Sequence, residues 1–415
     1  MLCKKTDKFW KTGFITISMM IVLSISGCSD VSIEETEIIE TESEVPIPVR
    51  SDPEEAEKVI EICFDLYAKA AEEKRTWDDL GTVRGIVNRL GENGYTAVDS
   101  QNQIDMTCIA QIEDFCRKVD EKADAEFTMI EVTYWGGFSI YHFRTEEGTV
   151  YVAKSYYEYE DGQIEEIATG SYVASSWNYT EDGYLMFSGS WFSETSYILT
   201  LSEAEEYIAF RVQPLNETCR ELNRKYLQPI GYERNNMFLE DWSEKDFGDL
   251  DFYDLYDILY SLINAKFVPY TADDNLSVDT VYRIQKEDFE RVIMTYFHID
   301  SEALQAKTIY YPEETGYEYR PRGFYEAEYP EWPYSEVVAF TENDDGTISL
   351  TVNVVFPYAG ISKVYAHEVV VRPLENGGVQ YVSNHIIPSE DNYEVTWHTP
   401  RLTAEEWEKM YGDYE

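Results

Sequence analysis

The sequence predicts an α+β fold in two domains, each a few helices packed on an antiparallel meander sheet. Three observations support this prediction: helical periodicity early in the chain, alternating apolar and polar residues from Phe127 onward, and a second helices-then-strands order after residue 228. Short Glu-Gly and Asp-Gly turns between the alternating segments indicate hairpins, and consecutive hairpins build antiparallel sheet. At 415 residues, the chain is long enough for two domains.

The beginning of the sequence has the features of a secretory signal. Lysines precede an apolar run over residues 14–23, which is too short to span a bilayer. Ser26 and Gly27 come directly before Cys28, which resembles the bacterial lipobox, where the cysteine sulfur receives a diacylglyceryl group before cleavage. We therefore expect a lipoprotein signal peptide over residues 1–27 and a lipid on Cys28 that anchors the protein to the outer face of the cell membrane. An ordinary secreted protein with a chance cysteine is the alternative.

Acidic residues dominate the composition, with 80 Asp and Glu against 33 Lys and Arg and a formal net charge of −47. Such a field repels nucleic acid and anionic polymers, and it concentrates cations near the surface. Nucleic-acid binding is therefore excluded, as is anchoring through a basic patch. Residues 28–52 are acidic and lack apolar periodicity, which predicts a disordered tether behind the lipid. The folded domains are expected over residues 53–228 and 229–415.

The first domain begins with helices. Asp52 is a capping residue, Pro53 favours the first helical position, and acidic residues follow in the first turn. Apolar stripes predict two more helices, over residues 82–90 and 105–123. Strands rich in β-branched and aromatic residues are expected over residues 127–135, 138–144, 149–159, 163–176 and 184–192. A capping box at 202–205 predicts a short helix, then a strand through Phe210 and a helix that carries Cys219.

The second domain repeats this order. Asp251 caps a predicted helix, and another helix is expected over residues 286–298. A Tyr- and Pro-rich acidic segment over residues 310–334 separates these helices from the strands. The strands are expected over residues 335–341, 347–356, 363–372 and 379–387, with a last helix from residue 403. A curved meander sheet preceded by helices resembles the cystatin or NTF2-like class, in which one sheet face lines a pocket.

Strand register in the second domain brings polar residues onto an otherwise apolar sheet face. Tight turns at residues 359–360 and 376–377 set the pairing, because Asn-Gly is a strong hairpin signal. With that register, His367 and Asn384 share the face with Tyr365 and with valine and leucine side chains. We expect a small-ligand pocket at these three residues. The alternative is that His367 and Asn384 are hydrogen-bonded core residues.

The Tyr- and Pro-rich segment provides a second candidate site. The chain contains 34 Tyr and 9 Trp, and this segment places Tyr311, Tyr319 and Trp332 among acidic residues. Aromatic faces beside carboxylates are suited to holding sugars, so we expect an aromatic ligand loop there. The alternative is that the rings pack on strands and close the core.

Metal-binding patterns are weak. The register sets Glu368 opposite His385, which is either an exposed cross-strand pair or a metal or acid–base pair. Aspartates over residues 246–257 do not have the spacing of an EF-hand loop, and a helix start with a solvated face explains most of them. No metal ligand is assigned and no cofactor is expected, although the negative field keeps calcium as an alternative.

Four cysteines remain in the folded domains: Cys63, Cys108, Cys116 and Cys219. Each lies on the apolar stripe of a predicted helix, where a small buried thiol is common. Cys108 and Cys116 are too far apart on one helix to form a bond. Two alternatives therefore remain: free buried thiols, or a bridge from Cys63 or Cys219 to that helix.

Signatures of common enzyme classes do not occur in the sequence. It lacks the nucleophile elbow, the zinc-protease helix motif, the dinucleotide-binding loop and the phosphate-binding loop. No catalytic residue is assigned, and the main expectation is a non-catalytic protein that binds a wall glycan, a surface protein or a small ligand. A hydrolase of wall polymer that uses a carboxylate pair is one alternative. A structural component of an envelope assembly is another.

Two blocks of the sequence resemble a known family. The first covers residues 219–232 and 235–242, and the second covers 367–374 and 380–385. They are similar to a lipoprotein family of Gram-positive anaerobic bacteria that is described only as a domain of unknown function. The resemblance implies neither an activity nor catalytic residues.

Overall fold

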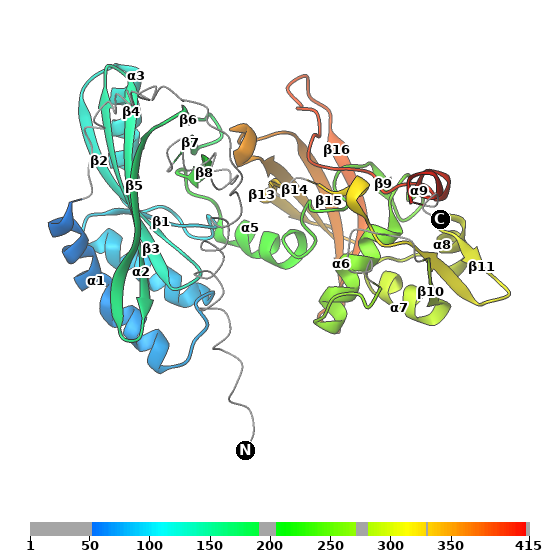
Figure 1. Cartoon of the computed structure of the whole chain (residues 1–415). Coiled ribbons are helices and arrows are strands. Elements are labelled where there is room, and N and C mark those ends of the chain that lie inside the picture. Colours follow the sequence, from blue (N-terminus) through cyan, green and yellow to red (C-terminus); the bar gives the residue numbers. More distant parts are fainter. Residues whose placement is uncertain (1–51, 191–204, 271–280, 329–330, 412–415) are drawn as a thin grey trace, which may run out of the picture. The chain divides into compact units, whose positions relative to one another are not determined.

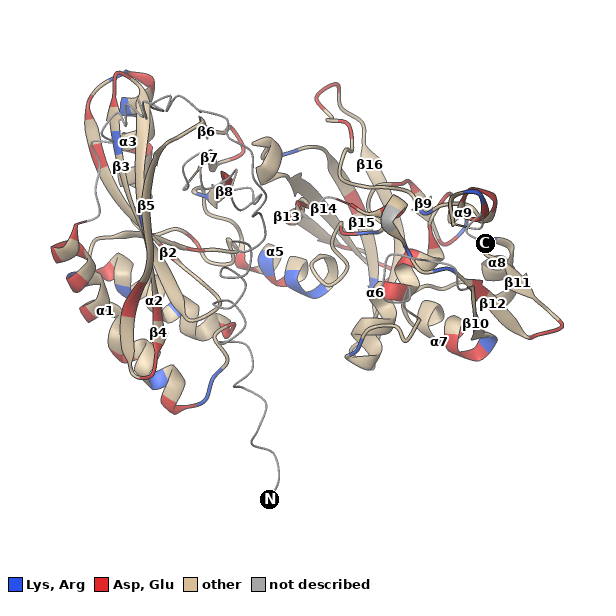
Figure 2. Cartoon of the chain, viewed as in Figure 1, with Lys and Arg blue, Asp and Glu red and all other residues tan. Residues whose placement is uncertain are grey.

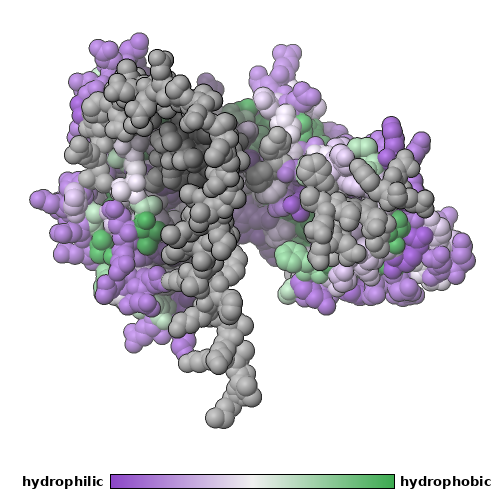
Figure 3. Space-filling model, viewed as in Figure 1, coloured by the Kyte–Doolittle hydropathy of each residue, from purple (hydrophilic) through white to green (hydrophobic). Residues whose placement is uncertain are grey.

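The computed structural model describes residues 52–190, 205–270, 281–328 and 331–411. These residues form a mixed α+β fold with several antiparallel sheets, as the sequence predicts (Figure 1). Residues 28–51 of the expected tether and residues 202–204 of the capping box predicted at 202–205 lie outside the described residues. Acidic side chains are spread over both halves of the chain (Figure 2). Hydrophilic residues cover most of the described surface that is visible in Figure 3.

Helices of the first half form where their caps and apolar stripes predict. Asp52 caps helix α1 (Pro53–Glu72), and its carboxylate accepts a hydrogen bond from the Glu54 N–H at 2.9 Å. Helices α2 (Leu80–Glu92) and α3 (Ile109–Asp120) follow. The apolar faces of α1 and α2 share a core with one part of the first sheet, and α3 packs against a second cluster that contains Phe143 and Phe187.

The first sheet contains one strand that the sequence analysis missed. Its order is β1-β2-β3-β4-β5, with β1 (Thr96–Asp99) parallel to β2 (Ala125–Val132). The other pairs are the expected hairpins of β3 (Gly137–Glu146), β4 (Thr149–Glu160) and β5 (Gln163–Val173). Helix α3 makes the crossover that a parallel pair requires, so this sheet is not a pure meander.

The predicted strand over residues 163–176 is divided in two. After β5 the chain enters a separate sheet of order β6-β7-β8. Its strands are β6 (Ser176–Tyr179), β7 (Tyr184–Ser190) and β8 (Glu205–Arg211). Helix α5 (Glu217–Leu222) follows and continues as one π-helical stretch, η1 (Asn223–Leu227).

The second half contains four helices in its described residues and another five-stranded sheet. Its helices are α6 (Phe252–Asn264), α7 (Lys286–Tyr296), α8 (Ser301–Ala306) and α9 (Ala404–Tyr411). The sheet order is β13-β14-β15-β16-β9. Its strands are β13 (Tyr334–Glu342), β14 (Ile348–Val355), β15 (Ala366–Pro373), β16 (Val379–Ile387) and β9 (Trp242–Ser243). The apolar stripes of α6 and α7 and the inner face of this sheet share one core.

The Tyr- and Pro-rich segment contains strands where the sequence analysis expected a loop. Strands β11 (Tyr310–Tyr311) and β12 (Gly316–Tyr319) pair with each other, and β12 also pairs with β10 (Tyr282–Gln285). Tyr317 and Tyr319 are buried in the core. The rings of these tyrosines supply buried apolar area to a small sheet. Prolines and other turn residues close by in the sequence favoured a loop, so the sheet was not predicted.

The predicted register of the second-half strands is confirmed, apart from one bulge. Val352 pairs with His367, and His367 pairs in turn with Ile386, as the turns predict. A bulge follows Val370 on the β15–β16 ladder, and beyond it Tyr381 faces the core in place of Val382. A bulge adds one residue to a strand and reverses the alternation beyond it.

The four described cysteines are free thiols. Cys63, Cys116 and Cys219 are buried, and burial raises the pKa of Cys63 to about 12. Cys108 is not on a helical stripe: it is the residue before α3 and has a left-handed backbone, with φ 47°. Within the described part of the chain, no helix has both the length and the apolar content needed to cross a membrane.

Candidate functional site

A groove of about 760 Å³ lies along α6 in the second half of the chain, and we call it the α6 groove. Its walls come from the segment after η1, from the outer side of α6, from the chain after β12, and from the residues just before β13. The lining combines aromatic rings, prolines and ionised side chains: Tyr232, Asp254, Asp257, Phe267, Tyr270, Tyr319, Arg322 and Trp332 are among its members.

Asp254 lies at the charged centre of the groove and is 1% exposed. The Arg322 guanidinium donates to both of its oxygens, from Nε at 2.9 Å and from Nη2 at 2.6 Å. Arg401 donates from Nε to Asp254 Oδ1 at 2.9 Å. Although burial acts in the opposite direction, Arg401 and Arg322 hold the pKa of Asp254 below its ordinary value. Asp254 is therefore a carboxylate shared by two guanidinium groups that favour its ionised form.

Asp257 lies one helical turn further along α6 and is the more accessible carboxylate. Its Oδ1 accepts from the Tyr319 hydroxyl at 2.6 Å, and its Oδ2 accepts from Arg401 Nη2 at 3.1 Å. Its side chain is 31% exposed, yet the surrounding protein desolvates the carboxylate and raises the pKa of Asp257 to about 6, against the opposing effect of Arg401. An ionised carboxylate offers about four acceptor positions. Asp257 can therefore accept further hydrogen bonds from a ligand in the groove.

Glu328 fixes the aromatic wall on the other side. One of its oxygens accepts from the Arg234 N–H at 2.9 Å and from Trp332 Nε1 at 3.3 Å. The other oxygen is hydrogen bonded to His398 Nδ1 at 2.9 Å and to the Thr399 N–H at 3.0 Å. Although burial acts in the opposite direction, the hydrogen bonds from His398, Thr399 and Arg234 keep the pKa of Glu328 below its ordinary value. The Trp332 indole is thus held in position before any ligand arrives.

The predicted aromatic ligand loop is brought together only in part. Tyr319 and Trp332 both line the α6 groove, and the Tyr270 ring lies 5.6 Å from the Tyr319 ring. Tyr311 lies in β11, outside the residues that line the groove, where its hydroxyl donates to Glu318 at 2.9 Å and the Arg283 guanidinium lies 4.1 Å from its ring.

The predicted sheet-face residues lie together in the core. His367 Nδ1 is 2.6 Å from Asn384 Oδ1, and His367 Nε2 is 2.8 Å from the Tyr232 hydroxyl. Asn384 Nδ2 donates to the Glu240 carbonyl at 2.8 Å, and the Tyr365 hydroxyl donates to a backbone carbonyl. Burial of the ring lowers the pKa of His367 to about 4. A ligand role for these residues stays a prediction, but Tyr232 connects their network to the groove wall.

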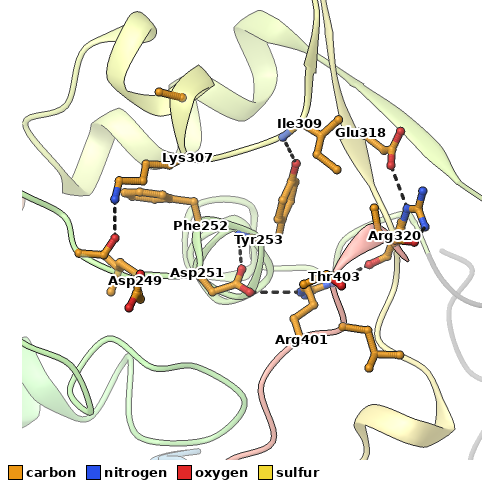
Figure 4. Close-up of a pocket in the computed structure, with 15 residues that line it drawn as sticks. Asp249, Asp251, Phe252, Tyr253, Lys307, Ile309, Glu318, Arg320, Arg401 and Thr403 are labelled. Carbon is orange, nitrogen blue, oxygen red and sulfur yellow. Dashed lines mark hydrogen bonds and ion pairs between the residues drawn. The ribbon is translucent and has the colours of Figure 1, made fainter. Parts of the chain in front are cut away.

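A second cavity of about 420 Å³ lies beside the first turn of α6 (Figure 4). Arg401 lines this cavity, while Asp254 and Asp257, which accept from Arg401, line the α6 groove. Lys307 donates to the Gly248 carbonyl, and the Tyr253 hydroxyl accepts from the Ile309 N–H at 2.8 Å. The buried ion cluster therefore separates two cavities.

Metal-ligand sets are not found among the described residues, in which no three His, Cys, Asp or Glu side chains are grouped to hold an ion. Aspartates of the 246–257 segment instead cap a helix and form the ion cluster. His385 is opposite Glu368, as expected, and its Nδ1 lies 3.1 Å from Asp241 Oδ2. A calcium role stays a prediction.

One family model matches most of the sequence. It is described as a family of unknown function, DUF6070, and it matches residues 50–401. The chain belongs to DUF6070. A search of curated proteins found no match, and neither did a search of solved structures. The family match agrees with the expectation of a domain of unknown function, and it includes every residue that lines the α6 groove.

The charged residues of the α6 groove were not predicted from the sequence. Asp254 and Asp257 were interpreted as the solvated face of a helix, because a helical aspartate without a partner in view is usually exposed. Their partner Arg401 is more than 140 residues away in the sequence. The only local signal was the spacing of the two aspartates, three positions apart, which places them on one side of α6.

Proposed function

We propose that this DUF6070 protein is a lipid-anchored, non-catalytic binding protein on the outer face of the cell membrane, with the α6 groove as its ligand site. The lipobox-like residues before Cys28 support the anchor and the location. The observation that supports binding is the groove itself, whose Trp332 and Tyr319 are already fixed by hydrogen bonds to Glu328 and Asp257. Fixed walls lose little conformational entropy on binding, which favours affinity.

The contacts of the carboxylates favour binding over catalysis. A glycosidase needs one carboxyl group as an acid and a second as a nucleophile or base. In the α6 groove, Arg322 donates to both oxygens of Asp254, and Arg401 donates to its Oδ1. A carboxylate held in this way is a poor nucleophile or base, so Asp257 has no free carboxylate beside it on α6.

Thermal unfolding of the full-length chain with a panel of wall fragments, sugars and peptides tests the binding site. A ligand at a hundred times its Kd adds about 2.7 kcal/mol to the unfolding free energy, which raises the midpoint by several degrees. We expect one ligand class to stabilise the chain, and Trp332→Ala to abolish the shift. Trp135→Ala is the matched control, because Trp135 is 55% exposed and lies outside the groove. Loss of the shift in both variants, or in neither, contradicts the proposed site.

The anchor is tested by Cys28→Ser in the native host. We expect the unmodified protein to fractionate with membranes and to carry a lipid label. The variant loses the lipid label and no longer fractionates as a lipoprotein. Membrane association and labelling that are unchanged in Cys28→Ser contradict the anchor.

Hydrolysis of a wall polymer is the second candidate, and one observation favours it. The pKa values of Asp254 and Asp257 are shifted in opposite directions, a pattern seen in acid–base pairs. If the protein is a hydrolase, the full-length chain releases reducing ends from wall polymer and Asp257→Asn abolishes that release. Binding without release of reducing ends supports the non-catalytic proposal.

A further inference from the structure

The charges on the α6 groove wall are already neutralised by other residues of the chain. Asp254 is shared by Arg322 and Arg401, and Arg401 also donates to Asp257. Arg322 further donates to two backbone carbonyls, those of Glu326 and Thr399. An ionic ligand would meet few unneutralised charges on this wall, and the overall charge of −47 opposes an anionic ligand in particular.

The groove nevertheless offers hydrogen-bond acceptors to a ligand. Each Asp257 oxygen accepts one hydrogen bond from the protein, and each can accept a second. Asp257 lines the groove and its side chain is 31% exposed, so a ligand in the groove can reach this residue. A pair of acceptors on one carboxylate matches two neighbouring hydroxyl groups of a ligand.

Apolar and aromatic surfaces lie beside this carboxylate. Trp332 and Tyr270 are half-buried in the groove wall, and Leu262 and Phe267 are 43% and 87% exposed at the groove. Aromatic side chains provide large contact areas at a low cost in conformational entropy. The groove therefore suits a ligand with an apolar face and several hydroxyl groups but no net charge.

We propose that the α6 groove binds a neutral carbohydrate chain, with one sugar ring packed on Trp332 and hydroxyl groups of the chain donating to Asp257. This inference rests on the proposed binding function and names its ligand class. Sugar rings present C–H faces to aromatic rings and hydroxyl edges to carboxylates. The groove volume of about 760 Å³ is within the range of sites that enclose a ligand of several rings.

The test is binding of the full-length chain to an array of neutral oligosaccharides, followed by titration calorimetry with those retained. The array includes tetrasaccharides of β-linked N-acetylglucosamine, β-linked glucose and α-linked glucose. A neutral tetrapeptide, spermine and inorganic phosphate serve as non-carbohydrate probes. We expect at least one neutral tetrasaccharide to bind, with at least a tenfold loss of affinity in Trp332→Ala and in Asp257→Asn. Trp135→Ala should bind like the unmodified chain.

The outcomes separate the two proposals. Binding of the peptide or spermine alone, with loss in Trp332→Ala, overturns the carbohydrate inference but retains the groove as a binding site. Binding of no probe overturns both. Oligosaccharide binding that survives both groove variants overturns the site. Circular dichroism of each variant verifies folding, and Asp257→Asn preserves side-chain size in case Trp332→Ala fails to fold.

Discussion

At the scale of single residues, Arg401 connects the C-terminal segment to α6. Its side chain is 7% exposed, and its guanidinium contacts Asp254 and Asp257, two carboxylates on one side of the helix. Removing one partner of a buried ion pair leaves an uncompensated charge in a poorly solvated site. Arg401 therefore matters for folding as well as for the groove wall.

We expect Arg401→Ala to lower the unfolding free energy by about 3–5 kcal/mol, since Asp254 remains buried and loses one of its two cations. Urea unfolding measures this change. Arg89→Ala is the control, because Arg89 forms an exposed pair with Asp65 and its loss should cost far less. If Arg401→Ala and Arg89→Ala lower the unfolding free energy equally, the buried contacts of Arg401 add no more stability than an exposed ion pair.

His367 makes folding sensitive to acid. Its pKa is lowered from 6.5 to about 4 by burial, so the unfolded chain binds the proton more readily than the folded chain between these values. The contribution of His367 to the unfolding free energy is fully present above about pH 6.5 and is lost as the pH falls toward 4. The contribution that is lost amounts to about 3 kcal/mol.

The prediction concerns the difference between the unmodified chain and His367→Gln, because other groups titrate in the same range. Urea unfolding at pH 7 and pH 4.5 should show a larger loss of unfolding free energy in the unmodified chain than in the variant. Identical pH dependence in both proteins contradicts a neutral, buried His367.

At the scale of elements, much of the fold was predictable because strand pairing follows local turns. The predicted β14–β15 register holds along the whole ladder. The pairs next to the Asn-Gly turn are offset by one residue from the predicted β15–β16 register, which holds only beyond the bulge after Val370. The aspartate before α6 caps its first turn, as predicted. Strand β1 was missed because its parallel partner lies beyond a helix. The bulge after Val370 was missed because no glycine or turn residue marks it.

The candidate site was less predictable than the fold. Tyr319 and Trp332 were identified because their segment is rich in aromatic and acidic residues, whereas Asp254 and Arg401 were not identified. Their contact depends on how the chain after β16 returns to α6, and a single sequence carries no signal for such a long-range pair. Likewise, Trp332 is held by Glu328, which also accepts hydrogen bonds from Arg234, earlier in the sequence, and from Thr399, later in the sequence.

Glu328 joins three segments, and its substitution tests that arrangement. Glu328→Gln exchanges one acceptor oxygen for a donor, so at least one of its four hydrogen bonds is lost. We expect a loss of about 1–3 kcal/mol in unfolding free energy, together with weaker ligand binding. Glu342→Gln, at an exposed position of β13, is the matched control. Unchanged stability and unchanged tryptophan fluorescence would contradict the positioning role.

At the scale of the whole molecule, we propose that Cys28 anchors the protein and that the second half of the chain binds the ligand. The domain boundary at residue 228 stays a prediction. Hydrogen bonds do connect the halves, for example from the Tyr184 hydroxyl to Glu336 at 2.6 Å and from the Asn223 side chain to the Ser335 carbonyl at 2.9 Å. The large negative charge is consistent with selection against anionic ligands.

The most direct test of the central claim is hydrogen–deuterium exchange of the full-length chain, with and without the neutral tetrasaccharides. If the α6 groove is the ligand site, exchange slows over residues 228–234 and 254–262, which form two of its walls. Exchange over β2, at residues 125–132, stays unchanged. Slowing confined to other segments, or no slowing in either groove wall, contradicts the account.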